Sequence, residues 1–129
     1  RSLAVTLFQS HVGSSDVALE MAVEDVVFGV ELAIPCGLIL NELITNALKH
    51  AFVDRPSGKV RVELARVDGD MMRLAVRDDG RGLPPGFDIK HSKSLGLQLI
   101  AALSRQIEAR LELENTGGAG FVLTFPFRS

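Results

Sequence analysis

The sequence contains no tryptophan, no tyrosine and a single cysteine, Cys36. One cysteine excludes an internal disulfide and a multi-cysteine zinc site, and it favours a reducing compartment, so we expect a cytoplasmic domain. An aromatic platform for nucleic-acid bases would have to use the seven phenylalanines alone. The formal net charge is only -2, which argues against a nucleic-acid or anionic-membrane partner.

Long apolar runs and low-complexity segments are also missing. No run approaches the ~18–20 residues that a membrane span needs, so we expect no direct membrane contact. The first residues, Arg1 to Leu3, lack the apolar region of a signal peptide. What remains is ordinary for a soluble protein: 129 residues, 47% hydrophobic and 23% charged. Length and composition therefore predict one folded domain with a single core.

Apolar periodicity gives the order of the secondary-structure elements. Alternation typical of strands recurs in five segments, at 17–23, 60–64, 72–76, 111–113 and 121–125. Helical periodicity covers 36–52, with Pro35 placed in the first turn, and 95–106. Short turns at 68–70 and 115–120 join neighbouring strands. We predict an α+β two-layer sandwich, in which helices cover one face of a mixed, mostly antiparallel sheet.

The helix predicted at 36–52 carries four polar residues on one stripe, roughly opposite its apolar stripe. Glu42 and Asn46 are four residues apart, and Lys49 and His50 follow three and four residues after Asn46. Carboxylate and carboxamide oxygens can ligate Mg²⁺, and a lysine can contact phosphate oxygens. The stripe suits a metal–phosphate complex, but a solvated helix face, the commoner setting for Glu and Lys, explains it as well.

A second candidate site follows the strand at 72–76. Alternation places Asp78 on the same face as the apolar residues of that strand, so its carboxylate ends on the buried side and needs a partner. The exocyclic amine of adenine is a natural donor, whereas guanine has a carbonyl there, so such a site would prefer ATP to GTP. Gly80 and Gly82 allow a sharp turn against a flat ring. The alternative is a capped Asp–Gly turn.

Two further segments contain glycines. Ser94-Leu95-Gly96-Leu97 begins the second helix, where backbone N–H groups can bind an anion and Gly96 permits close approach. The preceding loop, 83–93, includes Lys93 and could act as a lid whose basic residues meet phosphates. Gly117 to Gly120 is expected to form a hairpin turn.

In this order and spacing, the four segments resemble the ATP-binding catalytic domain of bacterial two-component sensor histidine kinases. That family belongs to the Bergerat-fold superfamily, with gyrase B, MutL and the ninety-kilodalton heat-shock chaperone. Residues 33–52 are similar to the N box, 78–82 to the G1 box, 94–97 to the G2 box and 118–120 to the terminal glycine box. The resemblance extends from about Val17 to Phe127 and implies the Bergerat fold.

The resemblance also implies roles for individual residues. Asn46 would ligate Mg²⁺ and Asp78 would read the adenine amino group, while Lys49 and His50 would lie near the phosphates as catalytic residues. The glycines would shape the adenine and phosphate contacts. The implied nucleotide-binding set is Asn46, Asp78, Gly80, Gly82, Lys93, Ser94, Leu95, Gly96 and Leu97.

Two positions depart from the common family pattern. Glu42 stands where many histidine kinases have asparagine and where the gyrase-like ATPases have a glutamate that activates water. Glu42 can therefore assist Mg²⁺ or act as a base. The lid is short, and Phe87 is the candidate for its phenylalanine box. Glu42, the lead-in Ile34-Pro35-Cys36-Gly37-Leu38 and the box Ser94-Leu95-Gly96-Leu97 together resemble a kinase subfamily that includes many soluble light and stress sensors.

The activity that the resemblance implies is transfer of the γ-phosphoryl group of ATP to a histidine, in a two-component phosphorelay. None of His11, His50 and His91 lies in a pattern expected of an acceptor on a dimer helix. We therefore expect residues 1–12 to be the end of an upstream helical dimerisation region or a linker, and residues 13–129 to be the catalytic domain. The implied partners are that dimerisation domain, outside this chain, and a response-regulator receiver domain, with a homodimeric full-length protein.

Three other functions fit the same motifs. An anti-sigma-factor serine kinase has this fold at similar length and also carries a glutamate in the N box. A catalytically silent nucleotide-binding module could act as a scaffold. A gyrase- or MutL-like ATPase module would be followed by a transducer domain. An upstream helical segment with a histidine would exclude the first, and phosphotransfer from labelled ATP to a dimerisation domain would exclude the second.

Overall fold

The computed structural model describes residues 2–12, 15–51, 57–84, 86–89 and 94–127. The elements are β1 (Ser2–Val12), β2 (Ser15–Glu24), α1 (Val30–Asn46), the π-helix η1 (Ala47–Ala51), β3 (Ser57–Asp68), β4 (Met71–Asp78), α2 (Leu95–Gln106), β5 (Arg110–Glu114) and β6 (Gly120–Pro126).

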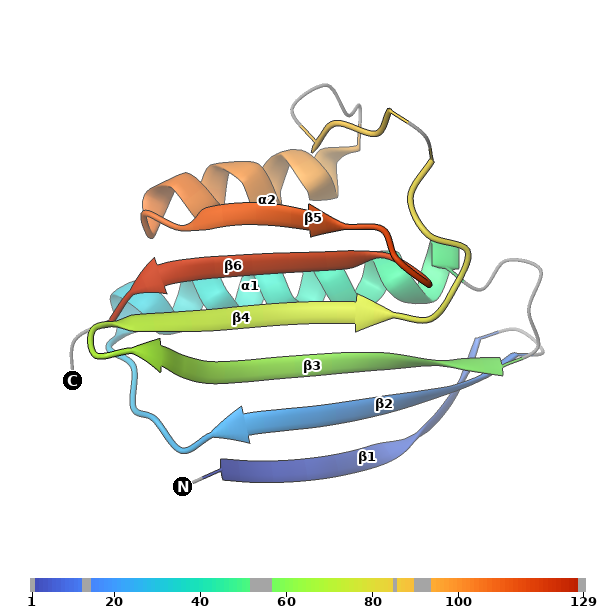
Figure 1. The fold of residues 1–129 in the computed structure, drawn as a ribbon, viewed down its shortest axis with the longest axis horizontal. Helices are drawn as coiled ribbons and strands as arrows, with labels where there is room; N and C mark the ends of the chain where they lie inside the picture. Colours follow the sequence, from blue (N-terminus) through green and yellow to red (C-terminus); the bar gives the residue numbers. More distant parts are fainter. Residues whose placement is uncertain (1, 13–14, 52–56, 85, 90–93, 128–129) are drawn as a thin grey trace.

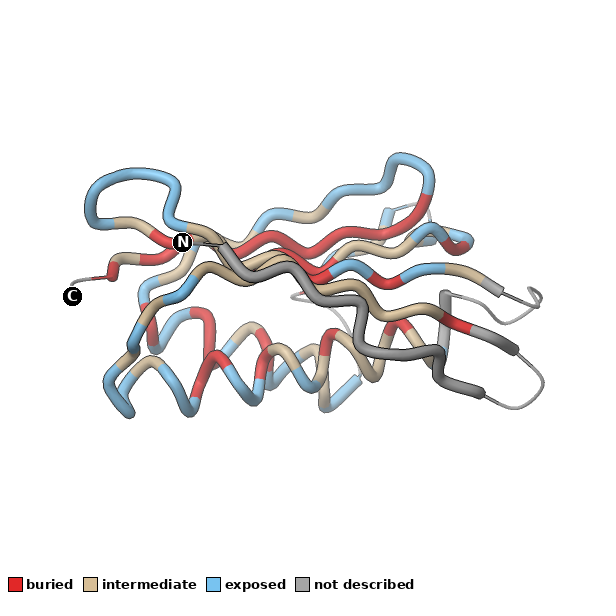
Figure 2. The backbone as a smooth tube through the Cα atoms, turned by 90° about the horizontal axis from the view of Figure 1, so that it is seen from below, coloured by how far each residue is buried: buried red, intermediate tan, exposed pale blue. Residues whose placement is uncertain are grey.

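The strands form one six-stranded sheet in the order β1-β2-β3-β4-β6-β5 (Figure 1). The β2–β3 pair is parallel, because α1 carries the chain across the sheet between them, and every other pair is antiparallel. Both α-helices lie on one side of the sheet (Figure 2). The predicted two-layer α+β sandwich with a mixed, mostly antiparallel sheet is confirmed.

The core fills the space between the sheet and the two helices. Alternate residues of β3, β4 and β6 point toward the helices, and the helices contribute residues spaced three and four apart. The largest fully buried side chains are Phe125, Ile39, Leu43, Met72, Ile100, Leu123, Val17, Val60 and Val62. Cys36 is also buried, which raises the pKa of its thiol to about 11 and keeps it neutral at physiological pH.

The helix α1 begins earlier than its sequence pattern predicts. Its N-cap is Gly29, whose carbonyl accepts hydrogen bonds from the N–H groups of Leu32 and Ala33 at 3.1 and 2.9 Å. Pro35 is therefore inside the helix and not in its first turn. The pattern was misleading because the exposed face of the first turns is also apolar, so those turns lack the contrast that marks an amphipathic helix.

The sequence has no uninterrupted apolar run of membrane-spanning length, because Glu31 and Glu42 interrupt the most apolar helix. Val30–Lys49 is long and apolar enough to span a bilayer by length and composition. Core helices of soluble proteins satisfy the same criterion, and α1 buries Ile39 and Leu43 against the sheet and α2.

Residues 2–12 form a strand, whereas the sequence suggested the end of a helix. The strand β1 pairs antiparallel with β2, from Ser2 opposite Glu24 to Val12 opposite Ser15. Leu3, Val5 and Leu7 alternate with small or polar residues, which is the period of a strand. The division of the chain at residues 12 and 13 remains a prediction.

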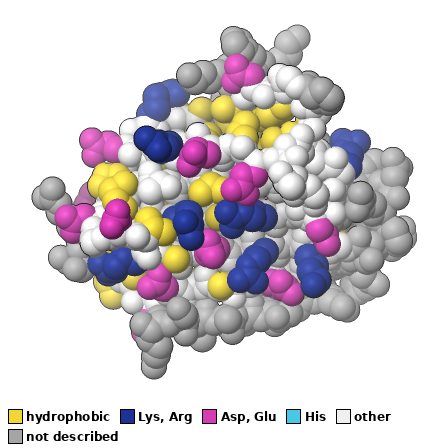
Figure 3. Space-filling model, in the orientation of Figure 1, with side chains coloured by type: hydrophobic (Ala, Val, Ile, Leu, Met, Phe, Trp, Pro, Cys, Tyr) yellow, Lys and Arg dark blue, Asp and Glu magenta, His cyan; other side chains and the backbone are white. Residues whose placement is uncertain are grey.

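The sheet face opposite the helices carries charges of both signs (Figure 3). Arg73 contacts Glu63 at 3.3 Å, and Arg77 contacts Glu114 at 2.8 Å. These are cross-strand pairs at the surface, each expected to contribute little to stability. The described side chains on this face are therefore largely charged, and the pocket described below lies on the helix side.

We predict that Ile39→Ala lowers the free energy of unfolding by about 2–5 kcal/mol, because Ile39 is 0% exposed and its loss leaves a cavity. Ile34→Ala on the same helix is the matched control. Ile34 is 61% exposed, so its truncation should change stability by no more than about 0.5 kcal/mol. Urea denaturation followed by circular dichroism measures both, and similar losses in the two variants would contradict the packing of α1.

Candidate functional site

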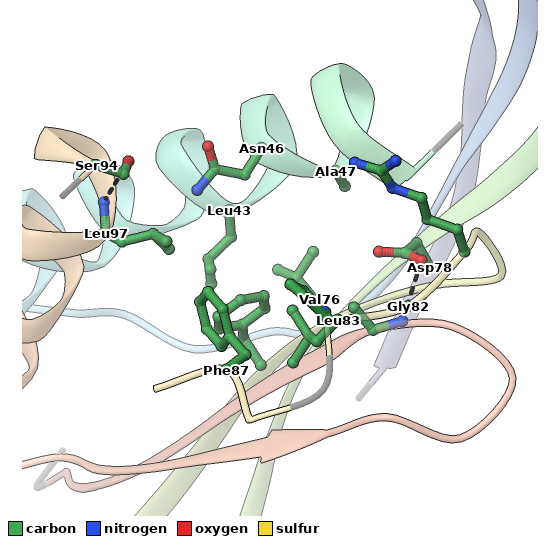
Figure 4. Close-up of a pocket in the computed structure, with 14 residues that line it drawn as sticks. Leu43, Asn46, Ala47, Val76, Asp78, Gly82, Leu83, Phe87, Ser94 and Leu97 are labelled. Carbon is green, nitrogen blue, oxygen red and sulfur yellow. Dashed lines mark hydrogen bonds between the residues drawn. The ribbon is translucent and has the colours of Figure 1, made fainter. Parts of the chain in front are cut away.

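A pocket of about 550 Å³ opens on the helix side of the sheet (Figure 4). Its walls come from the C-terminal end of α1, the end of β4 with the loop that follows, the start of α2, and the start of β6. The lining residues are Leu43, Asn46, Ala47, Val76, Asp78, Arg81, Gly82, Leu83, Pro84, Phe87, Ser94, Leu97, Ala119 and Phe121. A mainly apolar wall with a few polar groups is typical of a small-molecule site.

Asp78 is the last residue of β4 and lies half-buried at one end of the pocket. The strand places it there because Met72, Leu74 and Val76 on the same face are buried, as the alternation predicted. Its Oδ1 accepts hydrogen bonds from the backbone N–H groups of Gly80 at 2.9 Å and Ala119 at 3.2 Å. The other carboxylate oxygen points into the pocket (Figure 4).

The turn between β5 and β6 packs directly behind Asp78. The N–H of Asp78 donates to the carbonyl of Ala119 at 2.9 Å. Gly118 has φ +136, and a Cβ at this position would overlap the carbonyl oxygen of Asp78. Only glycine combines that backbone conformation with that approach. The segment predicted only to be a hairpin turn therefore also fixes the position of Asp78.

Asn46 lies on the opposite side of the pocket, at the end of α1. Its Nδ2 is buried and has no hydrogen-bond partner within the part of the chain that the structure describes. A buried polar group without a partner is costly, so this amide is a candidate ligand group. The π-helix η1 begins at the next residue, and such widened turns are frequent at functional sites.

Asn46 lies on the opposite side of the helix from the one that the predicted polar stripe implies. The stripe of Glu42, Asn46, Lys49 and His50 was expected opposite the apolar stripe, yet Asn46 lines the pocket together with Leu43 and Ala47. Residues at i, i+3 and i+4 share a face, so 43, 46 and 47 necessarily lie together. Lys49 is exposed and outside the lining. The side chain of His50 lies outside the described part of the structure.

Glu42 contacts the start of α2 and does not line the pocket. A Cβ on Gly96 would overlap Oε1 of Glu42, so a larger residue at position 96 would displace the Glu42 carboxylate. In the described structure the side chain beside Gly96 is that of Glu42, and the approach of an anion to Gly96 stays a prediction. The helix α2 is capped by Ser94, whose Oγ accepts from the N–H of Leu97 at 3.3 Å.

The pocket brings together part of the predicted set. Asn46, Asp78, Gly82, Ser94 and Leu97 line it, whereas Glu42, Lys49, Gly80, Leu95 and Gly96 do not. Leu95 is 82% exposed, and Gly80 acts through its hydrogen bond to Asp78. Lys93 lies outside the described residues.

Several lining residues were absent from the predicted set. Arg81 sits between the two glycines of the Asp78–Gly82 motif, and that position was the available signal. Leu83, Pro84 and Phe87 are apolar residues in a loop, which is itself a sign of a binding wall. Of these three, only Phe87 was expected to have a role, as the candidate for a phenylalanine box.

Comparison with known proteins places this geometry in context. Residues 32–129 match the family described as histidine kinase-, DNA gyrase B-, and HSP90-like ATPase. The blue-light-activated histidine kinase 2 of Erythrobacter litoralis is 34% identical over 111 residues, which are 86% of this chain and 32% of that protein. The sensor histidine kinase PdtaS of Mycolicibacterium smegmatis is 34% identical over 93 residues, 69% of this chain and 18% of that protein.

A solved structure has the same fold. The histidine kinase domain from the Erythrobacter litoralis EL346 blue-light-activated histidine kinase superimposes with a TM-score of 0.81 at 32% identity, covering 90% of this chain and 53% of that one. The chain thus spans about a third or less of the curated relatives described above.

We predict that Gly118→Ala lowers the free energy of unfolding by roughly 2–4 kcal/mol, because the added methyl forces the turn away from Asp78. Gly69→Ala is the control: Gly69 lies in the β3–β4 turn with nothing within 4 Å of an added Cβ. It should change stability by no more than about 0.5 kcal/mol. Thermal unfolding compares the two, and a stable Gly118→Ala protein would refute the close approach.

Proposed function

The chain belongs to the family of histidine kinase-, DNA gyrase B- and HSP90-like ATPases, and from this premise we propose that it binds ATP with Mg²⁺ and transfers the γ-phosphoryl group to a histidine of a dimerisation domain. It is an ATP-binding catalytic domain of the sensor histidine kinase type. The observation that carries the proposal is the presence of two polar groups across one pocket. The carboxylate of Asp78 lies at one end, and Asn46, whose Nδ2 has no partner in the described part of the chain, lies opposite it.

Asp78 is assigned to the adenine base. One of its oxygens is held by two backbone N–H groups, so the other is presented in a fixed direction. A carboxylate oxygen accepts from the adenine amino group and offers nothing to the guanine carbonyl at the same position. Val76, Leu83 and Phe121 supply apolar walls for the flat ring. The site therefore selects adenine by one hydrogen bond and by shape.

Asn46 is assigned to Mg²⁺. Rotation of the side-chain amide by half a turn exchanges Oδ1 and Nδ2, so the amide can present its oxygen to a cation. In the described residues no cluster of three or more His, Cys, Asp or Glu side chains could hold a metal ion. That fits a cation held largely by substrate phosphates, which needs only one or two protein oxygens. When bound, the ion would neutralise charge on the phosphates.

Glu42 is assigned an indirect role. It lies one helical turn before Asn46 but packs against Gly96 at the start of α2, outside the pocket lining. This position favours support of the metal end of the site over activation of a water molecule. Arg81 brings a guanidinium to the pocket wall, and the first N–H groups of α2 add partial positive charge. Positioning and charge neutralisation are the main requirements of phosphoryl transfer.

The partners and the location follow from the same assignment. We infer that the acceptor histidine belongs to the protein's own dimerisation domain, outside this chain, in a homodimer. The phosphoryl group would then pass to the receiver domain of a response regulator. The domain would work in the cytoplasm without direct contact with nucleic acid or membrane, as its single cysteine and small net charge suggest.

We predict that Asp78→Asn weakens ATP binding about a hundredfold while preserving the fold. Asparagine keeps one oxygen for the N–H groups of Gly80 and Ala119 but faces the adenine amino group with a second donor. Asp78→Ala should abolish ATP binding. It also removes the hydrogen bonds to the N–H groups of Gly80 and Ala119 and so disturbs the loop after β4. Titration calorimetry compares these variants with Asp70→Asn, an exposed control. Equal affinities of wild type and Asp78→Asn would rule out the adenine assignment.

We predict that Asn46→Ala reduces the dependence of binding on magnesium more than it reduces metal-free nucleotide affinity. The reason is that Asn46 contributes through the cation and not through the base. Asn41→Ala, on the exposed face of the same helix, is the matched control. ATP is titrated with and without Mg²⁺, and an equal gain from magnesium in both Asn46→Ala and wild type would exclude Asn46 as a ligand.

A further inference from the structure

The side chain of Asn115 joins the β5–β6 turn to the wall of the pocket. The N–H of Leu83 donates to Oδ1 of Asn115 at 2.9 Å, and Nδ2 of Asn115 donates to the carbonyl of Leu83 at 3.1 Å. The amide thus satisfies both backbone groups of one residue that is 32 positions away, as a neighbouring strand would. A Cβ on Gly82 would overlap Oδ1 of Asn115, so the amide also lies against the preceding residue.

The same turn holds the other end of the loop. Two hydrogen bonds join Ala119 and Asp78. The N–H of Ala119 donates to the carboxylate of Asp78, and the N–H of Asp78 donates to the carbonyl of Ala119. We use the name clamp for Asn115 and Ala119 together. The clamp fixes the loop of residues 78–83 at its first and last residues, and Asp78, Gly82 and Leu83 all line the pocket.

The turn is itself anchored to the sheet beside this loop. Glu114 accepts hydrogen bonds from Arg77 Nε and Nη2 at 2.8 and 3.4 Å. The two residues lie on the strands that flank β6, each opposite Gly120. That hydrogen bond lowers the pKa of the Glu114 carboxyl, so the pair stays charged near neutral pH. A Cβ on Gly120 would lie 2.9 Å from Glu114 Oε1, so glycine leaves room for the bridge.

We propose that Asn115 is a positioning residue of the nucleotide pocket: it sets the place of Leu83, and so the width of the cleft for the base. This inference rests on the proposed ATP-binding function. Asn115 is exposed and lies outside the hydrophobic core. Its two hydrogen bonds to Leu83 therefore act on the pocket wall and contribute little to the core.

Loss of the amide has a defined consequence. The N–H and carbonyl of Leu83 would turn to water, and the loop would populate conformations in which Leu83 no longer forms the wall. The nucleotide would then have to order the loop on binding, at a cost in affinity. The Asp78 end should remain in place, because Ala119 holds it through backbone groups that a side-chain substitution does not remove.

The test compares Asn115→Ala with Thr116→Ala, a change of the next residue of the same turn, which is also exposed. ATP and ADP affinities are measured by calorimetry, thermal unfolding is measured without nucleotide, and amide hydrogen exchange is followed at Leu83 and Ala119. For Asn115→Ala we expect about tenfold weaker binding, in line with two lost hydrogen bonds. We also expect faster exchange at Leu83 alone. Thr116→Ala should match wild type in every measurement.

Two results would overturn the inference: Asn115→Ala binding ATP as tightly as wild type, or equal acceleration of exchange at Leu83 and Ala119, which signals general destabilisation. Failure of the proposed function looks different, because wild type itself would then not bind ATP in the same titration. In that case the inference fails together with the proposed function. If instead wild type binds ATP and Asn115→Ala binds it equally well, only the inference is rejected.

Discussion

At the end of β4, two segments 41 residues apart are joined by reciprocal hydrogen bonds between Asp78 and Ala119. One carboxylate oxygen of Asp78 accepts hydrogen bonds from the N–H groups of Ala119 and Gly80. The orientation of the other oxygen is therefore fixed. The close approach of the two segments requires glycine at position 118, where a Cβ would overlap the carbonyl oxygen of Asp78. It also continues the β4–β6 pairing, in which Arg77 lies opposite Gly120. The rest of the pocket is arranged around this fixed carboxylate, and its chemistry depends on that orientation.

The opposite wall is held by a different force. Burial of Ile39 and Leu43 fastens α1 to the sheet, and this apolar contact carries Asn46 into the pocket, where its Nδ2 has no hydrogen-bond partner among the described residues. The hydrophobic core therefore offsets the cost of a buried Nδ2 donor that no described residue satisfies. A ligand that satisfies the amide would recover that cost. The polar groups at the two ends of the pocket are thus preorganised, one by hydrogen bonds and the other by packing.

The fold and the burial of Asp78 could be predicted from the sequence, because strand alternation is local, whereas the helix face that carries Asn46 was predicted wrongly. Asp78 was placed on the correct face by counting residues along β4. The start of α1 was missed, since its outward residues Val30 and Ile34 are as apolar as its inward ones. The contacts of Asn115 with Leu83 and of Glu42 with Gly96 could not be predicted, because each depends on tertiary packing between distant segments.

The charges around the pocket bear on how the domain would hold a triphosphate. In the described lining, Asp78 and Arg81 carry one charge of each sign, so these side chains do not by themselves neutralise a polyphosphate. Under the proposed function, most of that neutralisation falls to Mg²⁺ and to the helix N-terminus of α2. Recognition of the base then supplies binding affinity. The contacts to the phosphates can strengthen as charge moves during phosphoryl transfer. That division is what catalysis requires, since interactions made equally before and during the reaction do not accelerate it.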